Sequence, residues 1–79
     1  MRQLVKVWTP NAQGRYAPSH DLACNVGFET AGATTTLCTG SAGGLRVGDR
    51  ISASHFGTWE VTAISISGDY LTADLKRLP

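Results

Sequence analysis

Apolar and polar residues alternate with a period of two along most of the chain, as in β-strands that bury one face. The segment 21–28 is the clearest case, with Leu22, Cys24, Val26 and Phe28 separated by small or polar residues. The same alternation recurs in other segments, several of them bounded by Gly, Asp or Ser. We therefore predict an all-β chain, with strands at 3–8, 21–28, 33–38, 45–53, 58–66 and 70–77.

The last of these segments has a second interpretation. Leu71, Leu75 and Leu78 fall at helical spacing, which would suit a short amphipathic helix. However, the Ser-Gly-Asp sequence at 67–69 directly follows an Ile-rich strand, and such a sequence favours a hairpin. We therefore predict a strand at 70–77 and keep the helix as the alternative.

The segment 45–53, LRVGDRISA, places an aspartate where its apolar face should continue. Counting from Leu45, every second residue is apolar except Asp49. Gly48 can adopt a positive φ, and an aspartate side chain readily binds backbone amides in a turn. A bend or bulge at Gly48 and Asp49 is therefore predicted, and it gives the carboxylate a structural role.

Six short strands with a sharp bend favour a strongly curved sheet. Such a sheet hides its edges by closing into a small β-barrel or by packing as a tight β-sandwich. We expect residues 1–79 to form one such domain, a single small β-barrel domain in the first case. The core is predicted to include Ile51, Trp59, Val61 and Leu71.

Two long segments rich in Pro, Gly, Ser, Thr and Ala do not fit this compact picture. Residues 9–21 and 29–44 are predicted to be long loops, with only a weak strand inside the second. Loops of more than about 12 residues are usually binding loops or disordered segments. We expect a partner to order them, with Tyr16 as the anchor because it is the large aromatic residue of the first loop.

Some apolar residues lie on the face opposite the predicted core. Leu4 and Trp8 flank Lys6 in the first strand, and Ile64 and Ile66 occupy the outer face of the fifth. Strands with two apolar faces are central in a closed barrel or are covered by another chain. The alternative is a bulge that returns Ile64 and Ile66 to the core. The candidate protein-interface residues are therefore Leu4, Trp8, Tyr16, Ile64 and Ile66.

The charge balance offers no long-range attraction for a polyanion. Seven basic and six acidic residues give a net charge of +1, so nucleic acid is not the expected partner. The opening MRQLVKVWTP has no unbroken apolar run, and no segment is long enough to span a bilayer. We expect no membrane partner and a cytoplasmic location.

The sequence contains no recognisable catalytic motif or cofactor site. Cys24 and Cys38 are interpreted as small buried hydrophobic residues, with a disulfide as the alternative in an oxidising compartment. A zinc site that adds His20 and His55 lacks the close ligand spacing of known zinc motifs. We therefore expect no enzyme activity, no cofactor and no metal.

The order of segments in LRVGDRISASHFGTWEVTAISISGDYLTADL, after an N-terminal strand and the excursion TPNAQGRYAPSHD, resembles the small neck proteins of tailed bacteriophages. This class comprises head–tail connectors, head-completion proteins and stoppers. The resemblance implies a virion component that forms a homo-oligomeric ring and has no catalytic activity. Its partners would be its own subunits and other virion proteins, in the virion and the host cytoplasm.

Two other classes remain open. One is a small binding protein, either a capsid decoration protein or an inhibitor of a host-defence complex. The other is an SH3-like barrel that binds nucleic acid or peptide, for which the best residues are Trp8, Trp59, Arg46 and Arg50.

Overall fold

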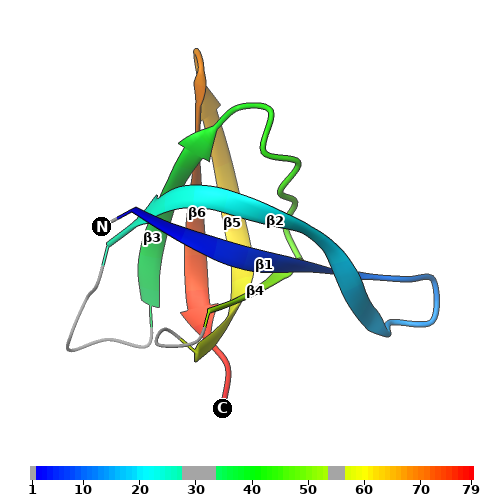
Figure 1. Ribbon diagram of the computed structural model, residues 1–79. Helices are drawn as coiled ribbons and strands as arrows, with labels where there is room; N and C mark the ends of the chain where they lie inside the picture. Colours follow the sequence, from blue (N-terminus) through cyan, green and yellow to red (C-terminus); the bar gives the residue numbers. More distant parts are fainter. Residues whose placement is uncertain (1, 28–33, 54–56) are drawn as a thin grey trace.

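Six β-strands form one closed sheet in the computed structural model, which describes residues 2–27, 34–53 and 57–79 (Figure 1). The strands are β1 (Arg2–Pro10), β2 (Tyr16–Val26), β3 (Thr34–Gly40), β4 (Arg50–Ala53), β5 (Gly57–Ser67) and β6 (Tyr70–Arg77). The described residues include no helix. The all-β prediction is confirmed, and of its two alternatives the structure has the closed barrel.

The barrel consists of two antiparallel meanders, β1-β2-β3 and β4-β5-β6. Antiparallel pairing of β1 with β4 and of β3 with β6 joins them into the ring β1-β2-β3-β6-β5-β4. Between described residues, β2 pairs with β3 at two positions, Asn25 with Cys38 and Val26 with Leu37. Elsewhere along β2, the loop between β3 and β4 contacts the strand through the side chain of His20.

The core lies inside this ring and consists of residues that the alternation pattern predicts to be buried. Ile51, Trp59, Val61 and Leu71 are all buried, so their predicted place in the core is confirmed. Among the described residues, the buried apolar side chains are Val5, Val7, Leu22, Cys24, Val26, Leu37, Leu45, Ile51, Trp59, Val61, Leu71, Ala73 and Leu75.

A bulge in β5 changes which side chains face the core. Val61 pairs with Leu75 and Ala63 with Asp74, so Thr62 is an extra residue on β5. After this shift Ala63 is exposed and Ile64 packs against the core. Ile66 remains 62% exposed near the end of the strand. The bulge interpretation is therefore confirmed for Ile64 and wrong for Ile66.

The first predicted long loop is wrong, because most of it belongs to a long hairpin. β1 extends to Pro10 and β2 begins at Tyr16, leaving a tight turn at 11–15. In this turn the Asn11 side-chain oxygen accepts hydrogen bonds from the backbone N–H groups of Gln13 and Arg15, at 2.9 and 3.0 Å. Gly14 has a φ of +79°, which glycine adopts without steric cost. Figure 1 shows this hairpin running past the barrel on the right.

Pro18 made the segment look like a loop, yet it lies within β2. It pairs with Trp8, and a register shift leaves Ser19 as an extra residue between Pro18 and His20. Proline lacks a backbone N–H, and bulges are among the places where a sheet tolerates it. The proline therefore marks an irregular strand instead of a loop.

Part of the second predicted loop is a strand, and another part is a connection between strands that contacts the barrel. Residues 34–40 form β3, whereas the predicted positions 28–33, with Phe28 and Glu29 among them, lie outside the described residues. In the connection that follows β3, the Gly43 carbonyl oxygen is 2.8 Å from His20 Nε2, and Leu45 is buried. The described part of this segment is thus ordered by contacts within the chain, contrary to the expectation that a partner orders it.

The expected bend at Gly48 and Asp49 is confirmed. The Asp49 backbone N–H donates to the Arg46 carbonyl at 3.1 Å, and Gly48 has a φ of +95°, as the third residue of a type II turn requires. The buried Asp49 carboxylate accepts a hydrogen bond from the Arg46 backbone N–H at 3.0 Å. The strand is shorter than predicted, because this turn ends before β4 and leaves Val47 exposed.

Replacing Gly48 with valine is expected to reduce the free energy of unfolding by about 1–2 kcal/mol, because valine disfavours positive φ. A Cβ at this position meets no atom within 4 Å, so the cost comes from the backbone alone. The matched control is Gly40→Val in β3, where the added Cβ is equally free and the φ is not positive. Urea denaturation measures the free energy of unfolding of both variants. An unchanged midpoint for Gly48→Val would contradict the turn geometry.

The last segment forms a strand, as predicted, and not the alternative helix. β5 and β6 join through a two-residue turn in which Ser67 pairs with Tyr70 and Gly68 has a φ of +58°. β4 and β5 also form a hairpin, ending with Ala53 opposite Gly57. Residues 54–56, including His55, lie outside the described residues.

Within the described part of the chain, no helix has the length and apolar composition needed to cross a membrane.

Candidate functional site

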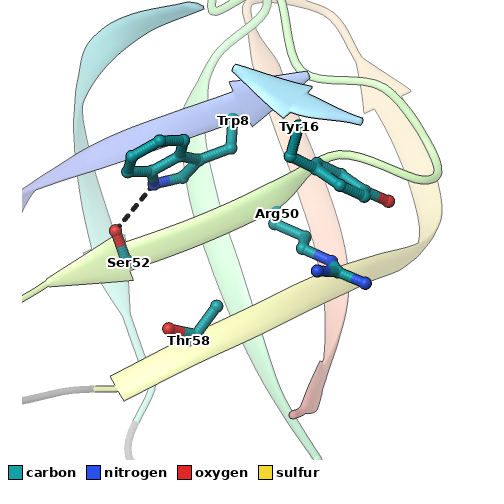
Figure 2. A pocket seen from close by; sticks show the side chains of 5 residues that line it. All are labelled: Trp8, Tyr16, Arg50, Ser52 and Thr58. Atoms are coloured by element: carbon teal, nitrogen blue, oxygen red, sulfur yellow. Dashed lines mark hydrogen bonds between the residues drawn. The ribbon is translucent and has the colours of Figure 1, made fainter. Parts of the chain in front are cut away.

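A pocket of about 270 Å³ opens on the outer face of the barrel where four strands meet (Figure 2). Its walls come from outward-facing positions of neighbouring strands, since Trp8 of β1 pairs with Arg50 of β4, and Ser52 of β4 pairs with Thr58 of β5. Tyr16, the first residue of β2, completes the rim. Alternation sends the neighbours Val7, Ile51 and Trp59 into the core, so the pocket residues are displayed on the opposite face.

The Trp8 side chain is fixed in place by a polar contact. Its indole Nε1–H donates a hydrogen bond to the Ser52 hydroxyl oxygen at 2.9 Å, as Figure 2 shows. Lys6 Nζ lies 5.8 Å from the centroid of the indole ring, within the range of a cation–π contact. The indole is therefore a half-exposed aromatic wall with a defined orientation.

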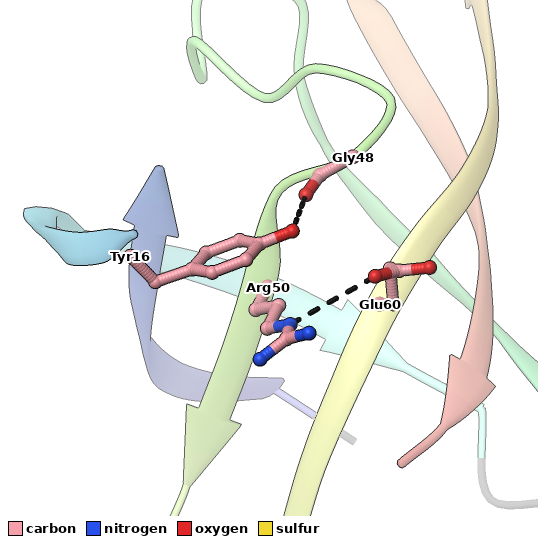
Figure 3. A network of polar contacts seen from close by, with 4 residues as sticks. All are labelled: Tyr16, Gly48, Arg50 and Glu60. Atoms are coloured by element: carbon pink, nitrogen blue, oxygen red, sulfur yellow. Dashed lines mark hydrogen bonds and ion pairs between the residues drawn. The ribbon is translucent and has the colours of Figure 1, made fainter. Parts of the chain in front are cut away.

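Arg50 is held between an aromatic ring and a carboxylate (Figure 3). Its guanidinium carbon is 4.0 Å from the centroid of the Tyr16 ring, and its Nε is 3.8 Å from Glu60 Oε1. The Tyr16 hydroxyl in turn donates to the Gly48 carbonyl at 2.7 Å. The two terminal amino groups of Arg50 make no hydrogen bond with any described residue, so they are available to a ligand.

These groups suit recognition of another side chain. Ser52 and Thr58 line the pocket together with Arg50. The Thr58 hydroxyl makes no hydrogen bond with a described residue. The volume lies just below the roughly 300–1,000 Å³ of small-molecule sites, and it can accommodate one large side chain. The pocket thus offers aromatic walls and hydrogen-bond donors to an aromatic or acidic group.

The structure brings only some of the predicted interface residues together. Trp8 and Tyr16 both line the pocket, although Tyr16 also stabilises its own domain through Gly48 and Arg50. Leu4, which is 66% exposed, lies near the start of β1 and does not line the pocket. Ile66 lies near the β5–β6 turn, also outside the pocket. Ile64 packs against the core.

Of the residues named for an SH3-like binder, Trp8 and Arg50 line the pocket and Trp59 is buried. Sequence reasoning missed Ser52 and Thr58 as pocket residues. Their positions opposite each other on β4 and β5 reveal them only once the strand register is known.

Both cysteines are free thiols, and they face opposite sides of the sheet. Cys24 lies in the core, where burial raises the pKa of its thiol. Cys38 pairs with Asn25, the next residue along β2, so it points outward. Cys38 is half-buried, and it borders a hollow of about 130 Å³ between β2 and β3 together with Tyr70.

Among residues 2–27, 34–53 and 57–79, no group of three or more His, Cys, Asp or Glu side chains could hold a metal ion. His20, one residue of the zinc alternative, lies with its ring nitrogens 2.9 Å from the Ser19 hydroxyl and 2.8 Å from the Gly43 carbonyl.

Comparison of the chain with protein-family models, with curated proteins and with solved structures gives no match.

Proposed function

We propose that this chain is a non-enzymatic assembly protein whose copies join into an oligomeric ring. The role is that of a small virion component that joins head and tail in a tailed phage, present in the host cytoplasm before assembly and in the virion after it. Its partners are then other copies of the chain and neighbouring virion proteins.

The observation that carries this proposal is the exposure of large apolar side chains. Ile66 and Tyr70 are 62% and 65% exposed, and both flank the turn at the end of the β5–β6 hairpin. Exposed apolar area yields about 25 cal/mol per Å² when a partner covers it. Because Tyr70 pairs with Ser67 and Ile66 with Leu71, the two side chains lie on opposite faces of this narrow projection, and each face presents one large apolar group to a partner.

The resemblance of residues 45–76 to phage neck proteins supports the same role. The closed barrel suits that class, because a barrel has few free edges and presents its contacts through hairpins. The near-neutral charge agrees with a protein partner rather than with nucleic acid.

Sedimentation velocity tests the proposal directly. The wild-type chain is expected to be monomeric near 10 µM and to form larger species as its concentration rises toward about 500 µM, the range of a small interface. A chain that stays monomeric throughout this range contradicts self-assembly.

The pocket favours a second candidate, a small barrel that binds an extended peptide. In that role Trp8 and Tyr16 contact the peptide and Arg50 takes an acidic group. The protein then remains a monomer, and the NMR signal of the Trp8 indole N–H shifts on addition of acidic peptides.

A further inference from the structure

We propose that the β5–β6 turn of one copy docks into the pocket beside Trp8 of the next. This inference rests on the proposed self-assembly and identifies the contact that produces it. Residues 66–70 are named the tip, and the pocket lined by Trp8, Tyr16, Arg50, Ser52 and Thr58 is named the Trp8 pocket.

The Trp8 pocket requires a ligand that combines a flat apolar group with hydrogen-bond acceptors. Its walls are the Trp8 and Tyr16 rings, and the Arg50 guanidinium and the Thr58 hydroxyl are free to donate. Lys6 adds a second positive charge beside Trp8. Two carboxylates lie on the same face, Glu60 next to Arg50 and Asp21 opposite Lys6 across β1 and β2, so the free donors of Arg50 carry the preference for an acidic group. An acidic group next to an aromatic ring matches this arrangement.

The tip presents these groups on one short projection. Tyr70 is 65% exposed, and Asp69 is exposed and makes no ion pair with any residue that the structure describes. The Asp69 carbonyl accepts a hydrogen bond from the Ser41 backbone N–H at 2.9 Å, which holds the tip against the β3–β4 loop. In the proposed contact, Asp69 meets Arg50, and the phenol ring of Tyr70 enters the pocket with its hydroxyl toward Ser52 and Thr58.

A copy of the chain cannot fill its own pocket with its own tip. Thr58 and Ser67 lie near opposite ends of β5, and the strand between them spans roughly 30 Å at about 3.3 Å per residue. Figure 1 shows the tip at the top of the barrel and the start of β5 at the bottom. The contact therefore joins different surfaces of two copies, and such head-to-tail contacts form rings when the rotation closes.

Charge reversal at the two partners provides the test. Sedimentation velocity up to about 500 µM compares the wild-type chain with Arg50→Glu, with Asp69→Arg and with the chain that carries both changes. Each single change is expected to weaken self-association at least tenfold, and the double change restores it by exchanging the two charges. The matched control is Asp74→Arg, an exposed aspartate on β6 away from the tip, which should associate like the wild type.

A mixing experiment keeps the test independent of any one variant. Trp8→Ala loses the pocket and Tyr70→Ala loses the tip, so neither is expected to form a ring alone. Mixed in equal amounts, they retain one intact contact and should form a dimer and no larger species. Circular dichroism confirms that each variant is folded before it is compared.

The outcomes separate the tip-to-pocket contact from the function on which it rests. Self-association of the wild type that persists unchanged in Arg50→Glu and Asp69→Arg overturns the contact and leaves self-assembly standing. A wild-type chain that stays monomeric overturns self-assembly itself. Binding of acidic peptides by such a monomer, lost in Trp8→Ala, assigns the pocket to a different protein.

Discussion

Replacing Trp59 with alanine is expected to reduce the free energy of unfolding by about 3–5 kcal/mol, the range for removing a buried tryptophan. Trp59 is 2% exposed and is the largest fully buried side chain of the described barrel. It pairs with Ile51 of β4 and Arg77 of β6, and the Arg77 guanidinium carbon lies 4.9 Å from the centroid of its ring. A small domain has a total stability toward the lower end of about 5–15 kcal/mol, so this change removes a large part of it.

Thermal denaturation followed by circular dichroism measures the effect. The melting temperature should fall by more than about 12 °C, since 1 kcal/mol corresponds to at least about 4 °C in a domain of this size. Trp8→Ala is the natural control, because it removes the same side chain from the outer face of β1. Near-wild-type melting of Trp59→Ala would contradict the packing of the core.

Replacing Asp49 with alanine is expected to reduce the free energy of unfolding by about 1.5–3 kcal/mol. The change removes the acceptor of the Arg46 backbone N–H in the turn that leads into β4. The same turn pairs with β5, because the Gly48 N–H donates to the Val61 carbonyl and the Val61 N–H donates to the Asp49 carbonyl, both at 2.9 Å. Loosening the turn therefore weakens the β4–β5 seam as well.

Asp49→Asn separates the hydrogen bond from the charge, since the amide keeps one acceptor oxygen of similar shape. It should lose less stability than Asp49→Ala in urea denaturation. Asp74→Ala, an exposed aspartate of β6, should stay within about 0.5 kcal/mol of the wild type. If Asp49→Ala matches this control, the buried carboxylate contributes nothing to the turn.

Several local features of the fold were predictable from single segments. The alternation in β2, β5 and β6 correctly places Leu22, Trp59 and Leu71 in the core, because a strand buries every second residue. The turn at Gly48 and the hairpin at 67–70 follow from residues that tolerate or stabilise those backbone conformations. Each of these features depends on neighbours in the sequence.

The features that were mispredicted depend on pairing between strands. Residues 16–20 look like a polar loop with a proline, yet β1 lies alongside them and supplies their hydrogen-bond partners. The sequence left open whether β5 contains a bulge, and only the register of β5 against β6 decides this and places the extra residue at Thr62. Local composition is a poor guide to the secondary structure of such residues, because partners far along the chain stabilise their conformation.

The candidate site shows the same division. The sequence by itself determined that Trp8 and Arg50 face outward, because their strand neighbours Val7 and Ile51 are apolar and enter the core. Only the tertiary structure placed Trp8, Tyr16, Arg50, Ser52 and Thr58 around one pocket, since they come from β1, β2, β4 and β5. Closure of the ring sets which strands are neighbours and in what register, and a pocket on its outer face exists only after that closure.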